Sequence, residues 1–317
     1  MKKLMTSMIG VVALMAMNGC STSRYYHLPT LEFDEIDYGF PVSKVAVRNV
    51  HIACIDQGRS DEVLLLIHGL GSYAKGWIRN IPAWAEDYRV IAVDLLGYSK
   101  SDKGYYDFTL SFHSQVLFEM LDELGIAEVT VVGHSMGGQI AMIMALERPE
   151  RVKRLVLISP AGFERFEKGE GQWMYKAVTP EFVKDTPIRS IATNLKSNFY
   201  NTPDEAEFMT TERIQIRGAH DFDLYCYAVS KNVEAMIEEP VWDKLDQIHQ
   251  PTLIIFGERD GLIPNPFLHG GKTINVARIG EEAIPNSRLI MMPDCGHFVH
   301  FEKPGETNRA VLSFMEE

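Results

Sequence analysis

A serine lies between two glycines at a point where the sequence predicts that a strand turns directly into a helix. Residues 133–137 read Gly-His-Ser-Met-Gly; they follow the apolar run Val129–Val132 and precede a predicted helix over Gln139–Glu147. Glycines two positions before and after the serine permit a tight turn in which the serine is strained and its hydroxyl exposed. The first turn of the helix offers free backbone N–H groups at the same place. The pattern predicts that Ser135 is a nucleophile that attacks a carbonyl carbon.

An acid that could support this serine follows a later apolar strand. Asp260 comes just after the predicted strand Thr252–Phe256, and catalytic groups gather at the carboxyl edge of such sheets. Glu258 is a competing acid only two residues away. We favour Asp260 because the turn between Gly257 and Gly261 would direct it along the sheet edge, whereas Glu258 is expected to be solvated.

A base is predicted close to the C-terminus. His297 follows the predicted strand Leu289–Met292 and a glycine, whereas His300 is expected in or near the closing helix, and Asp294 is interpreted as a loop residue. His297 would take the proton of Ser135, and Asp260 would hold the imidazole in the correct tautomer. An acyl-enzyme and its release by water follow from this arrangement.

The developing oxyanion needs donors, and an upstream strand predicts one of them. The apolar run Val63–Ile67 ends in a loop that reads His-Gly-Leu-Gly over residues 68–71. We expect the backbone N–H groups of Leu70 and Met136 to form the oxyanion hole. His68 is interpreted as a structural residue of this loop.

These segments together resemble the α/β-hydrolase superfamily, over roughly residues 42–317. The order serine, aspartate, histidine is that family's order. Residues 94–101, Asp-Leu-Leu-Gly-Tyr-Ser-Lys-Ser, are similar to a family loop in which Ser99 replaces a glycine and Asp94 stabilises the turn. The end of the chain, residues 296–304, is similar to the histidine-bearing stretch of capped esterases and lipases. Ser135 disfavours relatives that use an aspartate nucleophile.

The resemblance implies an α/β fold: a mostly parallel sheet with helices on both faces and a helical lid insertion at about 161–248. Two antiparallel strands are expected at Lys44–Arg48 and His51–Asp56, and further helices at Trp77–Tyr88, Leu110–Leu124 and Thr307–Phe314. The lid segment is rich in aromatic residues and methionine. Most of these side chains would form the core of the lid, and we expect some to face Ser135 as an apolar pocket; the candidates are Trp173, Phe199 and Tyr225.

Composition limits the partners of the protein. The chain has 317 residues, 46% of them hydrophobic, and a formal net charge of −12, which excludes nucleic acid as a partner. The sequence predicts neither a metal nor a cofactor, and it leaves the oligomeric state open. Beyond Cys20, the cysteines are Cys54, Cys226 and Cys295, an odd number that argues against a disulfide framework. Cys295 is interpreted as a small buried residue.

The first twenty residues are predicted to be a signal rather than part of the fold. Lys2 and Lys3 precede a mostly apolar stretch over Leu4–Met17 that is too short to span a bilayer comfortably. Residues 1–20 resemble a bacterial lipoprotein signal peptide, with Cys20 as the lipidated residue; an ordinary secretory signal is the alternative. The resemblance implies a location in the bacterial cell envelope, anchored by lipid, in the outer membrane if the host is Gram-negative. Residues 21–41 are interpreted as a tether.

The combined prediction is a serine hydrolase that cleaves carboxylic esters, such as an acyl ester or a monoacylglycerol. Hydrolysis of a carbon–carbon bond in a dienoic acid and a cofactor-free perhydrolase reaction use the same triad and stay open. A non-catalytic binding protein of the same fold is a further alternative, although it would have no need of all three residues.

Overall fold

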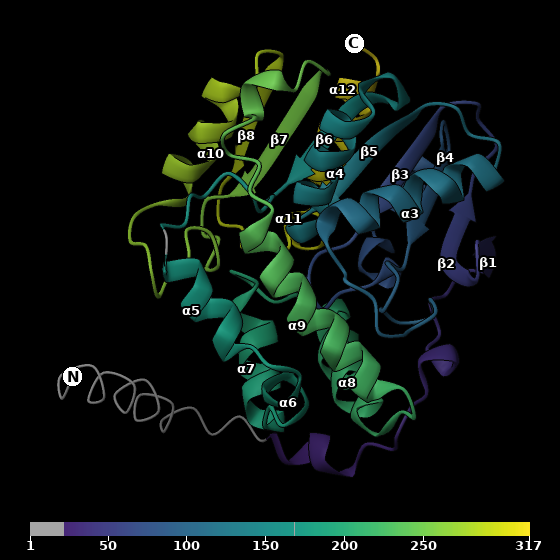
Figure 1. The fold of residues 1–317 in the computed structure, drawn as a ribbon, viewed down its shortest axis with the longest axis vertical. Coiled ribbons are helices and arrows are strands. Elements are labelled where there is room, and N and C mark those ends of the chain that lie inside the picture. Colours follow the sequence, from purple (N-terminus) through teal and green to yellow (C-terminus); the bar gives the residue numbers. More distant parts are fainter. Residues whose placement is uncertain (1–21, 168) are drawn as a thin grey trace.

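In the computed structural model, which describes residues 22–167 and 169–317, the chain builds one eight-stranded sheet in the order β1-β2-β4-β3-β5-β6-β7-β8 (Figure 1). β2 pairs antiparallel with β1 and β4, and all other neighbours are parallel. The strands are β1 (Val42–Val47), β2 (Val50–Gln57), β3 (Val63–Ile67), β4 (Arg89–Val93), β5 (Val129–His134), β6 (Val152–Ile158), β7 (Thr252–Gly257) and β8 (Ser287–Met292).

The central strands are buried along their whole length. β3, with the sequence Val-Leu-Leu-Leu-Ile, has no exposed residue, and the same holds for β5 and β7. Continuous apolar runs of this kind are expected where helices cover both faces of a parallel sheet. Figure 1 shows α3 (Leu110–Glu123) and α4 (Met136–Glu147) in front of the sheet and α12 (Pro304–Met315) behind it.

One predicted helix is wrong in extent. The sequence suggested a continuous helix over Trp77–Tyr88, but the structure has a 3₁₀ turn, η4 (Ala74–Trp77), and a single α-turn, α2 (Ile81–Trp84). Pro82 explains the break, because a proline lacks the N–H that an interior helical position requires and is tolerated only in the first turn.

The lid lies between β6 and β7, where the insertion was predicted, and Figure 1 shows its helices grouped below the sheet. Its α-helices are α5 (Glu170–Ala177), α6 (Pro180–Lys184), α7 (Ile188–Ser197), α8 (Glu207–Gln215) and α9 (Phe222–Glu238). The remaining elements of the described chain are η2 (Thr22–His27), η3 (Phe33–Glu35), η5 (Pro149–Arg151), η6 (Asp204–Ala206), η7 (Ile216–Gly218), η8 (Leu245–Gln247), α10 (Thr273–Ala283) and α11 (Val299–Glu302).

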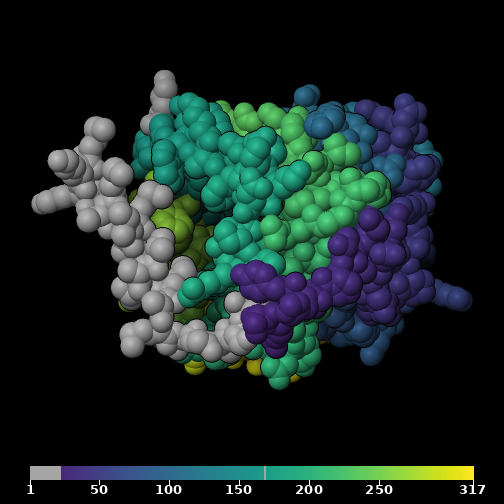
Figure 2. Space-filling model, turned by 90° about the horizontal axis from the view of Figure 1, so that it is seen from below, coloured from purple at the N-terminus to yellow at the C-terminus, as the bar shows by residue number. Residues whose placement is uncertain are grey.

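The segment that precedes the sheet is not a free tether as far as the structure describes it. Four of its side chains, Tyr25, Phe33, Ile36 and Tyr38, are at most 4% exposed. Figure 2 shows this N-terminal segment, in purple, lying across the green and teal surface of the lid. The interpretation of residues 21–41 as a spacer therefore fails for the described part, because its apolar side chains are buried against the lid and the sheet.

The loop after β4 is held by one buried carboxylate, in the role predicted for Asp94. Its oxygens accept hydrogen bonds from the backbone N–H groups of Ala74 (2.7 Å) and Lys100 (3.0 Å) and from the Tyr38 hydroxyl (2.6 Å). Burial raises the pKa of Asp94 to about 6. Asp94 therefore ties the loop after β4, the loop after β3 and the N-terminal segment together.

The three cysteines within the described residues, Cys54, Cys226 and Cys295, are free and buried, which agrees with the interpretation of Cys295. Across these residues no helix has the length and apolarity needed to cross a membrane. The predicted signal peptide and Cys20 lie outside the described part of the chain.

Candidate active site

Ser135 occupies a strained turn between β5 and α4. Its backbone has φ 55° and ψ −119°, a region that side-chain-bearing residues rarely adopt. A Cβ on Gly133 would lie 2.3 Å from the carbonyl oxygen of Gly137, and one on Gly137 would lie 2.2 Å from the carbonyl oxygen of Ile67. Only glycine fits at either position, as the sequence pattern predicted.

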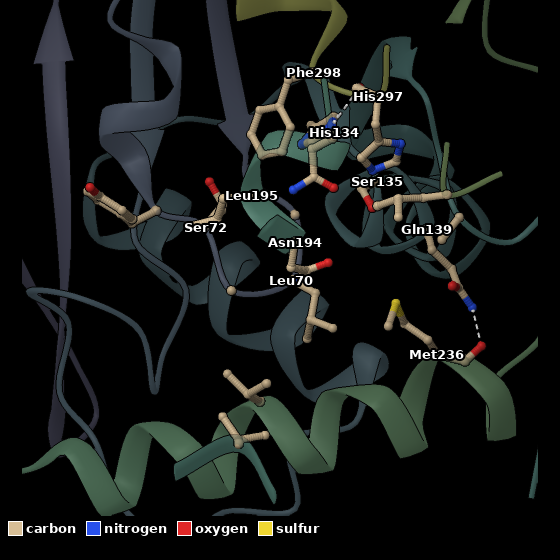
Figure 3. A pocket seen from close by; sticks show the side chains of 18 of the residues that line it. Leu70, Ser72, His134, Ser135, Gln139, Asn194, Leu195, Met236, His297 and Phe298 are labelled. Atoms are coloured by element: carbon tan, nitrogen blue, oxygen red, sulfur yellow. Dashed lines mark hydrogen bonds between the residues drawn. The ribbon is translucent and has the colours of Figure 1, made fainter. Parts of the chain in front are cut away.

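The predicted acid and base lie side by side at the carboxyl edge of the sheet. Nδ1 of His297 is 2.8 Å from Oδ2 of Asp260, and both side chains are almost completely buried. The other oxygen of Asp260 accepts from the backbone N–H groups of Leu262 (2.8 Å) and Ile263 (3.1 Å). These bonds leave Asp260 one oxygen for His297. Figure 3 shows the imidazole of His297 lying next to the Ser135 side chain.

The competing residues lie elsewhere. Glu258 and Asp294 are both exposed, so neither shares the buried environment of His297. His300 is buried in α11 rather than beside Ser135, and its ring lies 4.2 Å from that of Trp77. The structure thus brings together Ser135, Asp260 and His297 and leaves their alternatives apart.

The two predicted oxyanion donors flank the serine. Met136 is the first residue of α4, where no intrahelical acceptor exists for its N–H. The loop that holds Leu70 packs tightly on the nucleophile, since a Cβ on Gly69 would lie 2.9 Å from the Cβ of Ser135. Both N–H groups are therefore placed at the turn that presents the serine.

His68 is structural, as the sequence analysis expected. Its Nε2 accepts from the backbone N–H of Leu95 (3.1 Å), so Nδ1 carries the proton and donates to the Gly69 carbonyl oxygen (2.8 Å). Burial lowers the pKa of His68 to about 4. A neutral ring with both nitrogens engaged has no free lone pair for catalysis.

His134 is a contact that the sequence reasoning missed. Its Nε2 donates to the carbonyl oxygen of His297 at 3.1 Å, and the two rings lie 4.8 Å apart (Figure 3). Burial is the main reason that the pKa of His134 lies well below its usual value, and the nearby His300 and His297 lower this pKa further. The neutral ring can therefore hold the backbone of the base. In the sequence, only the position of His134 next to Ser135 could have indicated this contact.

A cavity of about 560 Å³ opens beside the triad. Its wall includes Ser135 and His297 and is otherwise mostly apolar, with contributions from the lid and from the loop after β7. In Figure 3, Leu70 and Met236 reach into this space below Ser135. Among the described lining residues, Arg213 is the only arginine or lysine.

Comparison with known proteins agrees with this geometry. Residues 62–304 match the family model described as alpha/beta hydrolase fold. The chain belongs to the α/β-hydrolase fold family.

Among its relatives, a 2-hydroxy-6-oxononadienedioate/2-hydroxy-6-oxononatrienedioate hydrolase of Burkholderia vietnamiensis is 32% identical, covering 82% of this chain and 89% of that protein. A 2-hydroxy-6-oxo-6-phenylhexa-2,4-dienoate hydrolase of Burkholderia cepacia is 28% identical over 86% of this chain and 94% of its own. The crystal structure of a probable hydrolytic enzyme from Pseudomonas aeruginosa superposes with a TM-score of 0.80 at 25% identity, covering 90% of this chain and 98% of that one. The protein is accordingly an enzyme of the hydrolase class.

Of the three pocket residues predicted for this hydrolase, only Tyr225 lines the cavity. Trp173 is 59% exposed on α5, and its neighbour Met174 faces the cavity instead. Phe199 packs against the ring of Phe298 at 5.3 Å, on the far side of the cavity wall. The prediction failed for these two because residue type does not reveal which face of a lid element is turned inward.

Two lining residues that the sequence analysis did not consider, Phe33 and Ile36, come from the N-terminal segment. Their apolar character was the available signal. It was weak because the same segment also carries Tyr25, Leu28 and Leu31, so residue type alone did not single out the two that face the cavity.

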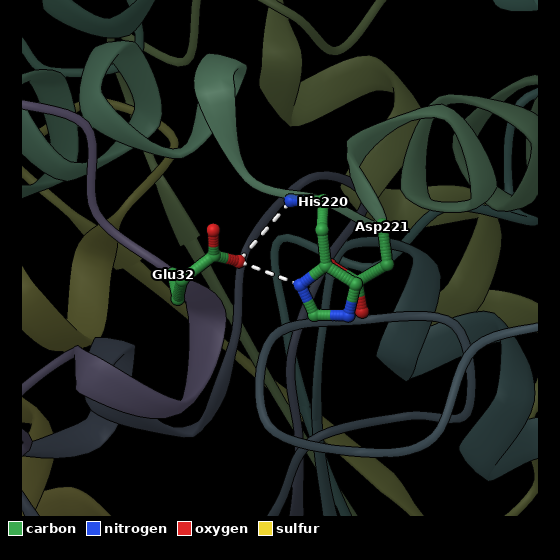
Figure 4. Close-up of side chains that lie close together, drawn as sticks. All are labelled: Glu32, His220 and Asp221. Atoms are coloured by element: carbon green, nitrogen blue, oxygen red, sulfur yellow. Dashed lines mark hydrogen bonds and ion pairs between the residues drawn. The ribbon is translucent and has the colours of Figure 1, made fainter.

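One group of possible metal ligands occurs among the described residues: Glu32, His220 and Asp221, with ligand atoms within 4.8 Å of one another. Figure 4 shows Oε2 of Glu32 accepting from both Nδ1 and the backbone N–H of His220, at 2.8 and 3.1 Å. Asp221 is paired with the ammonium group of Lys103 at 3.0 Å. Because a cation already neutralises this group, it is best explained as a contact between the N-terminal segment and the lid.

Proposed function

We propose that this hydrolase cleaves carboxylic esters that carry an apolar chain, through an acyl-enzyme on Ser135. The observation that supports this most strongly is the opening of the Ser135, His297 and Asp260 group onto a largely apolar cavity of about 560 Å³. A volume of this order is typical of small-molecule sites, and an apolar wall favours burial of an acyl or alkyl chain.

Each group has a step in the proposed reaction. Asp260 engages Nδ1 of His297, which leaves Nε2 to take the proton of Ser135 as its oxygen attacks the ester carbonyl carbon. The N–H groups of Leu70 and Met136 stabilise the negative oxygen that forms. His297 then gives the proton to the departing alcohol, and a water activated by the same histidine releases the acid. No metal or cofactor takes part in this sequence.

A second candidate is hydrolysis of a carbon–carbon bond in a dienoic acid, since the two Burkholderia relatives are named as hydrolases of acids of this type. Arg213 favours it, because this residue lines the cavity and its Nη1 is buried without a hydrogen-bond partner among the described residues, with the guanidinium lying over the rings of Phe222 and Tyr225. A carboxylate of such a substrate could pair with it. Glu164 and Glu212 also line the cavity, but they are paired with His269 (2.5 Å) and Lys75 (2.6 Å), so they do not decide between the two candidates.

A direct comparison of substrates separates the two candidates. The purified enzyme would be assayed with p-nitrophenyl esters from acetate to palmitate, with monoacylglycerol, and with a 2-hydroxy-6-oxo-dienoate. We expect the highest kcat/KM among the esters, and Arg213→Gln should change it less than about threefold. A preference for the dienoate that Arg213→Gln abolishes would replace the proposal with the second candidate. Binding of these compounds without any turnover would indicate a non-catalytic member of the family.

A further inference from the structure

The N-terminal segment 22–38, named here the strap, runs along α7, α8 and the start of α9 before it reaches the sheet. Near its start, Tyr25 is buried among Ile191, Ala192 and Ile214 of the lid and donates a hydrogen bond to Glu207 at 2.9 Å. Further along, the backbone N–H of Leu31 donates to the carbonyl oxygen of Gln215. The strap therefore packs as an additional layer on α7 and α8.

The middle of the strap turns toward the cavity at Glu32 and Phe33. Glu32 is held by His220, as Figure 4 shows, and its neighbour Phe33 opens the short helix η3. The ammonium nitrogen of Lys103 lies 4.0 Å from the centre of the Phe33 ring, and Lys103 is itself paired with Asp221. A cation over an aromatic face fixes the position of the ring. Phe33 is thus held from the lid side and from the sheet side.

Phe33 and Ile36 then form part of the cavity wall. They are 4% and 2% exposed, and both line the cavity that contains Ser135. The Phe33 ring lies 5.6 Å from the ring of Tyr225. The Tyr225 hydroxyl is 3.5 Å from the carbonyl oxygen of Gly71, in the loop after β3 that also holds Leu70. The strap side of the cavity is therefore continuous with the loop that receives the reacting carbonyl.

We infer that the strap is a substrate-binding element and that Phe33 and Ile36 determine the length of the apolar chain that the active site accepts. This inference rests on the ester hydrolase function proposed above. A chain that extends from Ser135 past Gly71 meets these two side chains, and their size limits how many methylene groups are buried. Discrimination by a pocket of this kind amounts to about tenfold or more for each methylene group.

Two substitutions with opposite effects on the cavity test this inference. Phe33→Ala enlarges the strap side, so the optimum among p-nitrophenyl and alkyl esters should move to longer chains, with at least a tenfold gain in relative kcat/KM for the longest ones. Ile36→Phe fills the same side, and the optimum should move to shorter chains. Both changes should occur mainly in KM, because the triad is untouched. Tyr26→Ala is the matched control, since Tyr26 lies on the same strap but is 61% exposed and does not line the cavity.

The outcomes separate this inference from the proposed function. If the wild-type enzyme cleaves esters but Phe33→Ala and Ile36→Phe both keep its chain-length profile, the strap only packs the lid and the inference is wrong. If the wild-type enzyme cleaves no ester, the proposed function itself fails. A thermal melt and labelling of Ser135 by a small fluorophosphonate identify a variant that has not folded, and the other variant then decides. A shift shared by Tyr26→Ala would also contradict the inference.

Discussion

At the scale of single residues, the main feature of the site is the buried acid–base pair of Asp260 and His297. Asp260 is fixed by two backbone N–H groups and by His297, while its nearest sequence competitor, Glu258, lies in solvent. The environment of each carboxylate, rather than its distance from the serine in sequence, determines which one can orient the base.

Substitution of the two acids tests this assignment. Asp260→Asn should lower kcat by about 10³-fold or more, because an amide favours the wrong tautomer of His297. Glu258→Gln should change kcat by less than about twofold. Steady-state kinetics on one ester measure both effects, and the reverse ranking would transfer the role of the acid to Glu258.

Buried histidines predict how the stability of the fold depends on pH. Burial lowers the pKa of His68 to about 4 and that of His113 and His300 to about 3. Below pH 6.5 the unfolded chain binds protons that these folded rings exclude, so each histidine should cost about 1.4 kcal/mol of stability per pH unit. Asp94 opposes this trend below about pH 6, because its raised pKa lets the folded form take up a proton.

The expected result is a free energy of unfolding that falls by roughly 4 to 5 kcal/mol between pH 6.5 and pH 5, because His134 acts in the same direction as the other three rings, measured by urea titration. The variant His113→Gln, far from the triad in α3, should have a shallower pH dependence with normal activity. Equal unfolding midpoints at the two pH values would show that these rings are not held neutral.

At the scale of elements, one face of the lid lines the cavity and the other faces solvent. Met236 on α9 reaches into the cavity, while its backbone carbonyl accepts from Gln139 of α4 at 3.0 Å (Figure 3). Because that hydrogen bond uses the backbone, substitution of the side chain changes the pocket without removing the contact between lid and domain.

Met236→Ala is therefore expected to shift the ester chain-length profile at unchanged labelling by a small fluorophosphonate. Trp173→Ala, on the exposed face of α5, should leave the profile unchanged. Kinetics over one ester series compare the two variants. An effect of Trp173→Ala as large as that of Met236→Ala would show that the cavity of the working enzyme is arranged differently.

The contrast between the sheet edge and the lid explains which site residues the sequence could predict. Ser135, Asp260 and His297 could be predicted to lie together because each follows a buried strand, and parallel strands bring their carboxyl ends to one edge. Trp173 and Phe199 were misplaced because no such rule determines which face of a lid element is turned toward the cavity. Phe33 and Ile36 were missed because the strap acquires its structure from contacts with residues distant in sequence, such as Lys103, His220 and Tyr225.

At the scale of the whole molecule, the strap determines how far the catalytic domain can lie from the predicted lipid anchor. We propose that the mature protein begins at a lipidated Cys20 in the cell envelope. Tyr25 is already buried against α7, so at most five residue steps separate the anchor from the lid. Even fully extended, that length is about 17 Å. The anchor would therefore hold the lid close to the bilayer rather than keep the catalytic domain away from it.

The anchor is tested by fractionation and mass spectrometry. Cys20→Ser should move the enzyme from the membrane to the soluble fraction at unchanged specific activity, because stable attachment depends on the acyl chains and an acidic protein gains nothing from anionic lipid. Mass spectrometry of the mature N-terminus provides the second measurement. An unmodified terminus at any residue other than Cys20 would rule the anchor out.

The central claim is that Ser135 is the nucleophile of a serine hydrolase whose base is His297. The most direct measurement is peptide mapping by mass spectrometry after reaction of the purified enzyme with a fluorophosphonate. We predict one modified peptide, labelled at Ser135, and at least about 10³-fold slower labelling in His297→Ala, because the base and the nucleophile act as a unit. Labelling of another residue, or labelling of Ser135 at an undiminished rate without His297, would contradict this account of the active site.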